Sequence, residues 1–76
     1  MSKTATICFE EAARLALASS PIFALRELHV EQDADALVIS GRVGTYYHKQ
    51  LAQETVRRVV DDVEDEFEVV NAIEVR

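Results

Sequence analysis

The chain has 76 residues, of which 49% are hydrophobic and 29% are charged, and its formal net charge is −6. This balance is typical of a small globular domain rather than a disordered chain, and the lack of excess Lys and Arg argues against nucleic acid as a partner. No apolar run approaches the roughly 20 residues that span a bilayer, and charged residues interrupt the N-terminal stretch that resembles an export signal, so we expect a cytoplasmic protein.

The negative charge is concentrated at the C-terminal end. Residues 1–60 contain equal numbers of acidic and basic residues, so the whole net charge lies in residues 61–76. The run 61–68, DDVEDEFE, lacks the spacing of an EF-hand. We interpret it as a solvated loop that discourages edge pairing by the strand behind it, with a loose surface calcium site as the alternative.

Residues 7–19 have the apolar periodicity of a helix. Thr6 is a plausible N-cap, and Ser20-Pro21 ends the helix because the residue before a proline is disfavoured in the α region. The predicted inner face consists of Cys8, Phe9, Ala12, Leu15, Ala16 and Ser19.

The next segments predict a connector and a β-hairpin. Ile22, Phe23 and Leu25 are expected to pack over the core as an irregular turn. Residues 26–32 and 36–43 alternate as strands, and the sequence Asp-Ala-Asp between them is typical of a turn. The predicted inner positions are Leu28, Val30, Leu37, Ile39, Gly41 and Val43.

A second helix is predicted over residues 46–60, with Gly44-Thr45 closing the strand and capping the helix. Residues 67–75 alternate as a third strand. The inner helix face holds His48, Ala52, Thr55, Val56 and Val59, and the inner strand face holds Phe67, Val69, Asn71, Ile73 and Val75.

The predicted fold class is α+β, a two-layer sandwich in the order α-β-β-α-β with both helices on one face of a three-stranded sheet. A right-handed crossover through the second helix makes the second and third strands parallel. We place the first strand in the middle of the sheet, and an edge position is the alternative.

Several motifs in this order resemble the BON domain family. The stretch 28–43, LHVEQDADALVISGRV, is similar to its hairpin with an acidic turn and a Ser-Gly-x-Val ending. Lys49 and Ala52 occupy familiar helix positions, Val-Asn-x-Ile-x-Val resembles the closing strand, and ASSPIFAL resembles the joint after the first helix. Two departures are Asp62-Val63 in place of the family's Gly-Val pair and about three additional residues within 64–68.

The resemblance implies one BON-like domain over residues 1–76. BON domains are small bacterial modules without catalytic activity that associate with phospholipid membranes or with other proteins, often in tandem in envelope proteins. The resemblance therefore leaves an envelope association open, although this sequence has one copy and we expect no export signal in it.

The predicted interaction surface lies on the second helix. Tyr46 and Tyr47 are amphipathic aromatic side chains near a polar stripe formed by Lys49, Gln53 and Arg57. Such side chains anchor protein partners or lie at membrane interfaces. The first hypothesis is protein–protein interaction, including self-association, and the alternative is a peripheral phospholipid-binding module. Exposed tyrosines without a role remain the ordinary explanation.

Gly41 and Asn71 are predicted to be structural. Gly41 is expected to allow the close approach of a helix side chain or to mark a bulge, and Asn71 is expected to hydrogen-bond backbone near the hairpin or a helix end. With only Cys8, His29 and His48 as soft ligands, three separate elements would have to converge on a metal. No nucleophile–base arrangement can be placed, so we expect no enzyme, metal or cofactor; a thiol/His metal-binding or enzymatic domain is the least favoured alternative.

Overall fold

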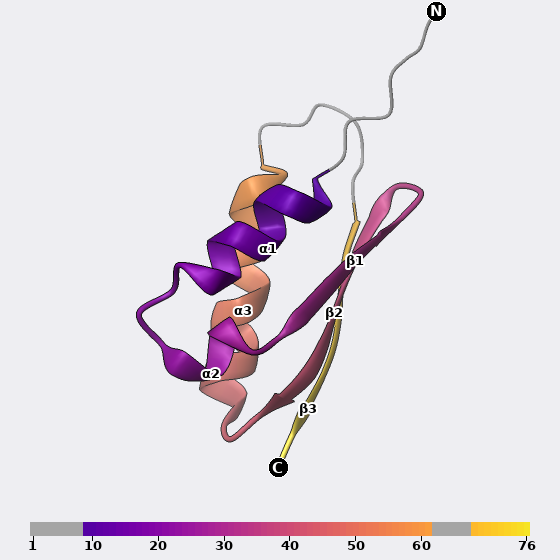
Figure 1. Ribbon diagram of the computed structural model, residues 1–76. Coiled ribbons are helices and arrows are strands. Elements are labelled where there is room, and N and C mark those ends of the chain that lie inside the picture. The colour runs from indigo at the N-terminus through magenta and orange to yellow at the C-terminus, as the bar shows by residue number, and fades with distance from the viewer. Residues whose placement is uncertain (1–8, 62–67) are drawn as a thin grey trace, which may run out of the picture.

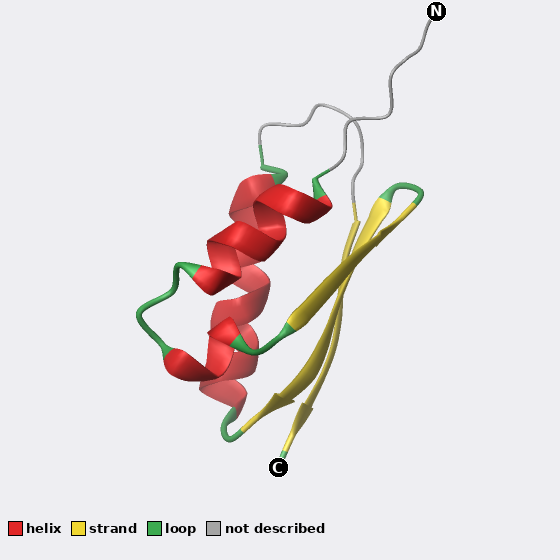
Figure 2. Ribbon diagram, in the orientation of Figure 1, coloured by secondary structure: helices red, strands yellow, loops and turns green. Residues whose placement is uncertain are grey.

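The protein forms a two-layer α+β fold with its helices packed on one face of a three-stranded mixed sheet (Figure 1). The computed structural model describes residues 9–61 and 68–76. Figure 2 shows the two layers, helices on one side and strands on the other. The predicted fold class is therefore confirmed, with one additional short helix.

Strands β1 (His29–Asp33) and β2 (Ala36–Val43) form the predicted antiparallel hairpin. The hairpin loop contains only Ala34 and Asp35, since Asp33 pairs with Ala36. Ala34 has a φ of 54°, a left-handed conformation that tight hairpin loops require and that is unfavourable for alanine.

Strand β3 (Glu68–Val75) runs parallel to β2, as predicted, with Ala36 opposite Glu68 and Val43 opposite Val75. The predicted position of the first strand is wrong, because the sheet order is β1-β2-β3 and β2 lies in the middle. The eight residues of β2 form an uninterrupted extended strand that can pair along both of its edges, which suits the central position. Strand β1 has only five residues and lies at an edge.

Helix α1 (Glu10–Ala18) is rotated relative to the prediction. Ala13 and Leu17 are buried, whereas Leu15 is 58% exposed and Ala12 is also exposed. The prediction failed because the helix carries alanine or leucine on several of its sides, so the apolar periodicity alone does not show which side is buried. The N-cap of α1 is Phe9 and not the predicted Thr6, which lies with Cys8 outside the described residues.

The connector contains a helical turn, α2 (Phe23–Arg26), followed by a second turn before β1. The backbone N–H of Leu28 donates to the Leu25 carbonyl oxygen (3.3 Å), so the strand begins at His29 and not at the predicted residue 26. These turns bury Leu25 and Leu28 in the core.

Helix α3 (Tyr46–Val59) begins where predicted and ends one residue early. The Thr45 side chain caps it, with its Oγ1 accepting from the His48 backbone N–H at 3.1 Å. Ala52 and Val56 are fully buried on the predicted side. No helix in the described part of the chain combines the length and apolar character needed to cross a membrane.

The core lies between the helices and the sheet. Its twelve buried hydrophobic residues are Ala13, Leu17, Leu25, Leu28, Val30, Leu37, Ile39, Val43, Ala52, Val56, Val60 and Ile73. No polar or charged residue of the described ranges is buried with them.

Gly41 is required by close packing within the hairpin. Its φ is +130°, and a Cβ added there would lie 2.7 Å from Leu28 Cδ2. The predicted approach of a helix side chain is wrong, because the approaching side chain is that of Leu28, the residue before β1. This contact fixes how Leu28 closes the end of the core.

Candidate functional site

The two tyrosines of the predicted interaction surface lie in the first turn of α3. Tyr46 is 75% exposed and Tyr47 is 67% exposed. The Thr45 cap fixes the start of this helix, so the backbone that carries both rings is ordered by a local hydrogen bond. Both side chains therefore project from a rigid support into solvent.

Helix α2 adds a third exposed ring that the sequence prediction placed over the core. Phe23 is 65% exposed, and the Arg26 guanidinium carbon lies 5.4 Å from its ring centroid, a cation–π contact. Helix α2 packs against α3 and lies beside its first turns (Figure 1). We call Phe23, Tyr46 and Tyr47 the aromatic end of the helical layer.

Lys49 and Gln53, in the middle of the predicted stripe, link α3 to β3 through hydrogen bonds. The Asn71 Nδ2 donates to the Lys49 carbonyl oxygen at 3.0 Å and to Gln53 Oε1 at 3.1 Å. Lys49 and Gln53 are half-buried along the boundary between α3 and β3. The Gln53 carboxamide is thus committed to an internal hydrogen bond. Asn71 bonds backbone within the helix rather than at its end.

Arg57 lies at the far end of the stripe. It is exposed and lines a shallow depression of about 280 Å³ together with Glu54, Arg58 and Asp61. It lies eleven positions after Tyr46 in the helix, which corresponds to about 16 Å. The five predicted surface residues therefore do not form one continuous site, and the aromatic end is separate from Arg57 and Arg58.

The two histidines lie on different sides of the sheet. His48 is half-buried on α3, with its ring centroid 5.9 Å from that of Tyr47. Its Nδ1 is buried and has no hydrogen-bond partner. His29 is exposed on β1, and its register partner Ser40 is exposed too, which places His29 on the face away from the helices. The structure does not bring these two ring systems together, and Cys8 lies outside the described residues.

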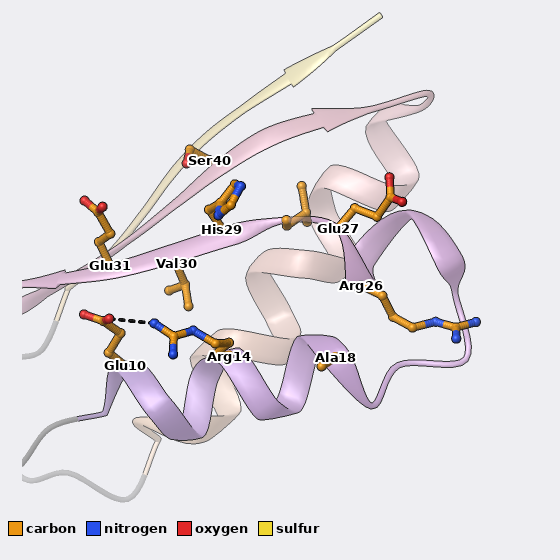
Figure 3. Close-up of a pocket in the computed structure, with 10 residues that line it drawn as sticks. Glu10, Arg14, Ala18, Arg26, Glu27, His29, Val30, Glu31 and Ser40 are labelled. Carbon is orange, nitrogen blue, oxygen red and sulfur yellow. Dashed lines mark hydrogen bonds and ion pairs between the residues drawn. The ribbon is translucent and has the colours of Figure 1, made fainter.

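A groove of about 700 Å³ runs between α1 and β1 (Figure 3). Val30 points from the strand toward α1, and the Glu10–Arg14 ion pair of 2.8 Å lies on the opposite wall. The lining carries Glu27 and Glu31 as well as Arg26, so its charges of opposite sign largely compensate one another. Within the described ranges, no three His, Cys, Asp or Glu side chains are arranged to hold a metal ion.

Most of the acidic run lies outside the described residues. Of 61–68, the structure describes Asp61, in the turn after α3, and Glu68, at the start of β3, and both are exposed. Glu68 donates its backbone N–H to the Asp35 carbonyl oxygen at 2.9 Å, which aligns β3 with the hairpin.

Comparisons of this chain with protein-family models, with curated proteins and with solved structures find no match. The aromatic end is accordingly selected on geometry: it combines three large exposed rings on two packed elements. The sequence identified Tyr46 and Tyr47 but missed Phe23. The exposure of Phe23 could have been predicted from its place in the apolar segment Phe23-Ala24-Leu25. A single turn of helix can bury only one side of such a segment, so one of its large side chains must face solvent.

Proposed function

We propose that this protein is a non-catalytic binding module, similar to a BON domain, that acts through protein–protein interaction at the aromatic end. The supporting observation is the exposure of Phe23, Tyr46 and Tyr47, each about two-thirds or more in contact with solvent. Large rings in solvent contribute little to the core of their own domain. Aromatic side chains are also the residues that most often dominate protein interfaces.

The support beneath the rings favours recognition of a defined partner. Tyr46 and Tyr47 extend from a capped helix, and the Arg26 guanidinium restrains the Phe23 ring. Restrained aromatic side chains lose little conformational entropy on binding, because few rotatable bonds remain to be fixed. A partner surface with an apolar pocket and an acidic group for Arg26 would match this arrangement.

A peripheral phospholipid-binding module is the second candidate. Exposed tyrosines on the same helix as Lys49, together with Phe23 and Arg26 on α2, also suit the interface between lipid headgroups and water. The net charge of −6 opposes attraction to anionic lipid, which is why protein–protein interaction is the preferred proposal.

Site-specific photocrosslinking in the native host tests the proposal. A benzophenone amino acid at Phe23 is compared with the same probe at Leu15, which is 58% exposed on α1 and serves as the matched control. We expect a discrete protein adduct from position 23 only. Added wild-type protein should compete for this adduct, whereas a Tyr46→Ser/Tyr47→Ser variant should not.

Equal adducts from both positions, or competition by the serine variant, would contradict the proposal.

Co-sedimentation with vesicles of phosphatidylglycerol and phosphatidylcholine at low salt addresses the second candidate. Pelleting of the wild type but not of the Tyr46→Ser/Tyr47→Ser variant would favour lipid binding over a protein partner.

A further inference from the structure

The sheet face opposite the helices has an apolar centre. In β1 every side chain on this face is polar, as expected for a sheet surface in water. In the other two strands the register places Val38 beside Val70, and Ser40 beside Ala72. Val70 is 36% exposed and Ala72 is also exposed. We call this surface the open sheet face.

The charges on the open sheet face are distributed unevenly along the strands. At the hairpin end, Asp33 and Glu68 flank Ala36 in one cross-strand row, and both are exposed. At the opposite end, Arg42 lies beside Glu74 with 3.5 Å between Nε and Oε1. Both of these side chains are about two-thirds exposed, so their ion pair is weak and open to competition.

We propose that a second copy of this chain packs on the open sheet face, with the twofold axis in the plane between the sheets and perpendicular to the strands. Sheets pack face to face with their strands nearly aligned, and this axis makes the two sets of strands antiparallel. Val70 then lies over Ala72 of the second copy, and Val38 lies over its Ser40. The inference goes beyond the proposed function, because it assigns self-association to a surface other than the aromatic end.

The charge distribution selects this axis over the alternative. Rotation about an axis along the strands would place each acidic end over the acidic end of the other copy. Rotation about the perpendicular axis instead centres Arg42 over Ala36 of the second copy, between its Asp33 and Glu68. His29 comes opposite Glu31 in the same arrangement. Glu74 comes opposite Glu68 of the second copy, and Arg42 lies beside both of these carboxylates.

The dimensions of the face predict a weak and reversible dimer. Three strands of up to eight residues cover about 26 by 14 Å. This face is smaller than the roughly 800 Å² per partner of a standard stable interface. We therefore expect a dimer whose population depends on protein concentration in the micromolar to millimolar range.

Analytical ultracentrifugation from about 10 µM to about 1 mM tests the inference. We expect the weight-average mass to rise toward twice that of the monomer. Val70→Lys, at an exposed position of an edge strand, should weaken dimerisation at least about tenfold. Glu11→Lys makes a larger charge change on the exposed side of α1 and should leave dimerisation intact. Circular dichroism verifies that each variant is folded.

A charge-exchange pair tests the axis itself. Arg42→Glu and the double variant Asp33→Arg/Glu68→Arg should each be monomeric alone, because like charges would meet across the twofold axis. Mixed in equal amounts, they should form a heterodimer, since both contact regions then pair opposite charges. A monomeric wild type at about 1 mM, or a mixture that remains monomeric while the wild type dimerises, would overturn the arrangement.

The outcome is separable from that of the proposed function. Loss of the dimer in Tyr46→Ser/Tyr47→Ser, with Val70→Lys still dimeric, would assign self-association to the aromatic end and reject the open sheet face. A monomeric protein that still gives the Phe23 adduct would reject the dimer while leaving the proposed function standing. A dimer that gives no Phe23 adduct would reject the proposed function and leave the dimer standing.

Discussion

The side-chain amide of Asn71 in β3 donates a hydrogen bond to the carbonyl oxygen of Lys49 in α3 at 3.0 Å. The Asn71 Oδ1 accepts from the Ile73 backbone N–H at 3.2 Å. Glu68 and Arg76 donate their backbone N–H groups toward the β2 side of β3. Successive N–H groups along a strand point to opposite edges, so the N–H of the odd-numbered Ile73 points to the outer edge of the sheet. Asn71 thus ties the helical layer to the sheet and occupies a donor on that edge.

Asn71→Ala should lower the free energy of unfolding by about 1–3 kcal/mol, because it removes the bridge between α3 and β3 together with the three hydrogen bonds of the Asn71 side chain. Urea unfolding followed by circular dichroism measures this change. Gln53→Ala is the matched control, since it removes only the 3.1 Å contact and should cost about 0.5–1.5 kcal/mol. Equal costs for the two variants would contradict the bridging role of Asn71.

A similar contact protects the other edge of the sheet. Glu10 Oε1 accepts from the Gln32 backbone N–H at 2.9 Å, and Gln32 Oε1 accepts from the Phe9 N–H at 2.6 Å. Glu10→Ala should destabilise the protein by about 1–2 kcal/mol and increase aggregation, because the β1 edge then presents an additional open donor. Thermal unfolding and light scattering report these effects.

Glu11→Ala is the control for that prediction. It removes an acidic residue from the same first turn of α1, but the ion pair of Glu11 with Arg14 is 4.0 Å long. Its effect should stay within about 0.5 kcal/mol. A Glu11→Ala variant as unstable as Glu10→Ala would assign the loss to the helix dipole rather than to the contact with β1.

Gly41→Ala should cost about 2–4 kcal/mol, since alanine is strained at a φ of +130° and its Cβ would press on Leu28. Gly44→Ala is the control, because no atom lies within 4 Å of a Cβ added there. Chemical denaturation of both variants compares them directly. A Gly41→Ala variant as stable as Gly44→Ala would show that the hairpin adapts without cost.

The aromatic end should contribute little to folding. A Phe23→Ser/Tyr46→Ser double variant should change the free energy of unfolding by about 0.5 kcal/mol per site or less, because both rings are in solvent. Leu25→Ala, two residues from Phe23 and only 1% exposed, should cost about 2–5 kcal/mol. Thermal unfolding gives both values. A large loss in the double variant would mean that the rings are part of the core.

Local signals in the sequence predicted much of this fold. Thr45 fixed the start of α3, and the Asp-Ala-Asp turn with flanking alternation located the hairpin, because these features act over a few residues. The buried side of α1 was predicted incorrectly: Leu15 and Leu17 are both apolar, and only the surface that the helix meets determines which is buried. The strand order failed for the same reason, since pairing of β2 with β3 is a distant interaction.

The candidate site was predicted only in part. Tyr46 and Tyr47 were identified because tyrosines next to a helix cap project outward. Phe23 was missed because its exposure follows from the burial of Leu25 in a single helical turn, which periodicity over one turn cannot define. Gln53 was assigned to the surface, yet its carboxamide is used by Asn71 across a separation of 18 residues.

The central position of β2 also has a kinetic consequence. Its pairing with β1 closes a two-residue loop, whereas its pairing with β3 joins Ala36 to Glu68 across the whole of α3. Because distant pairing carries the larger loop-closure entropy, we expect the hairpin to form before β3 docks. Gly41→Ala should then mainly slow refolding, whereas Asn71→Ala should mainly accelerate unfolding, and the two limbs of a chevron plot would separate them.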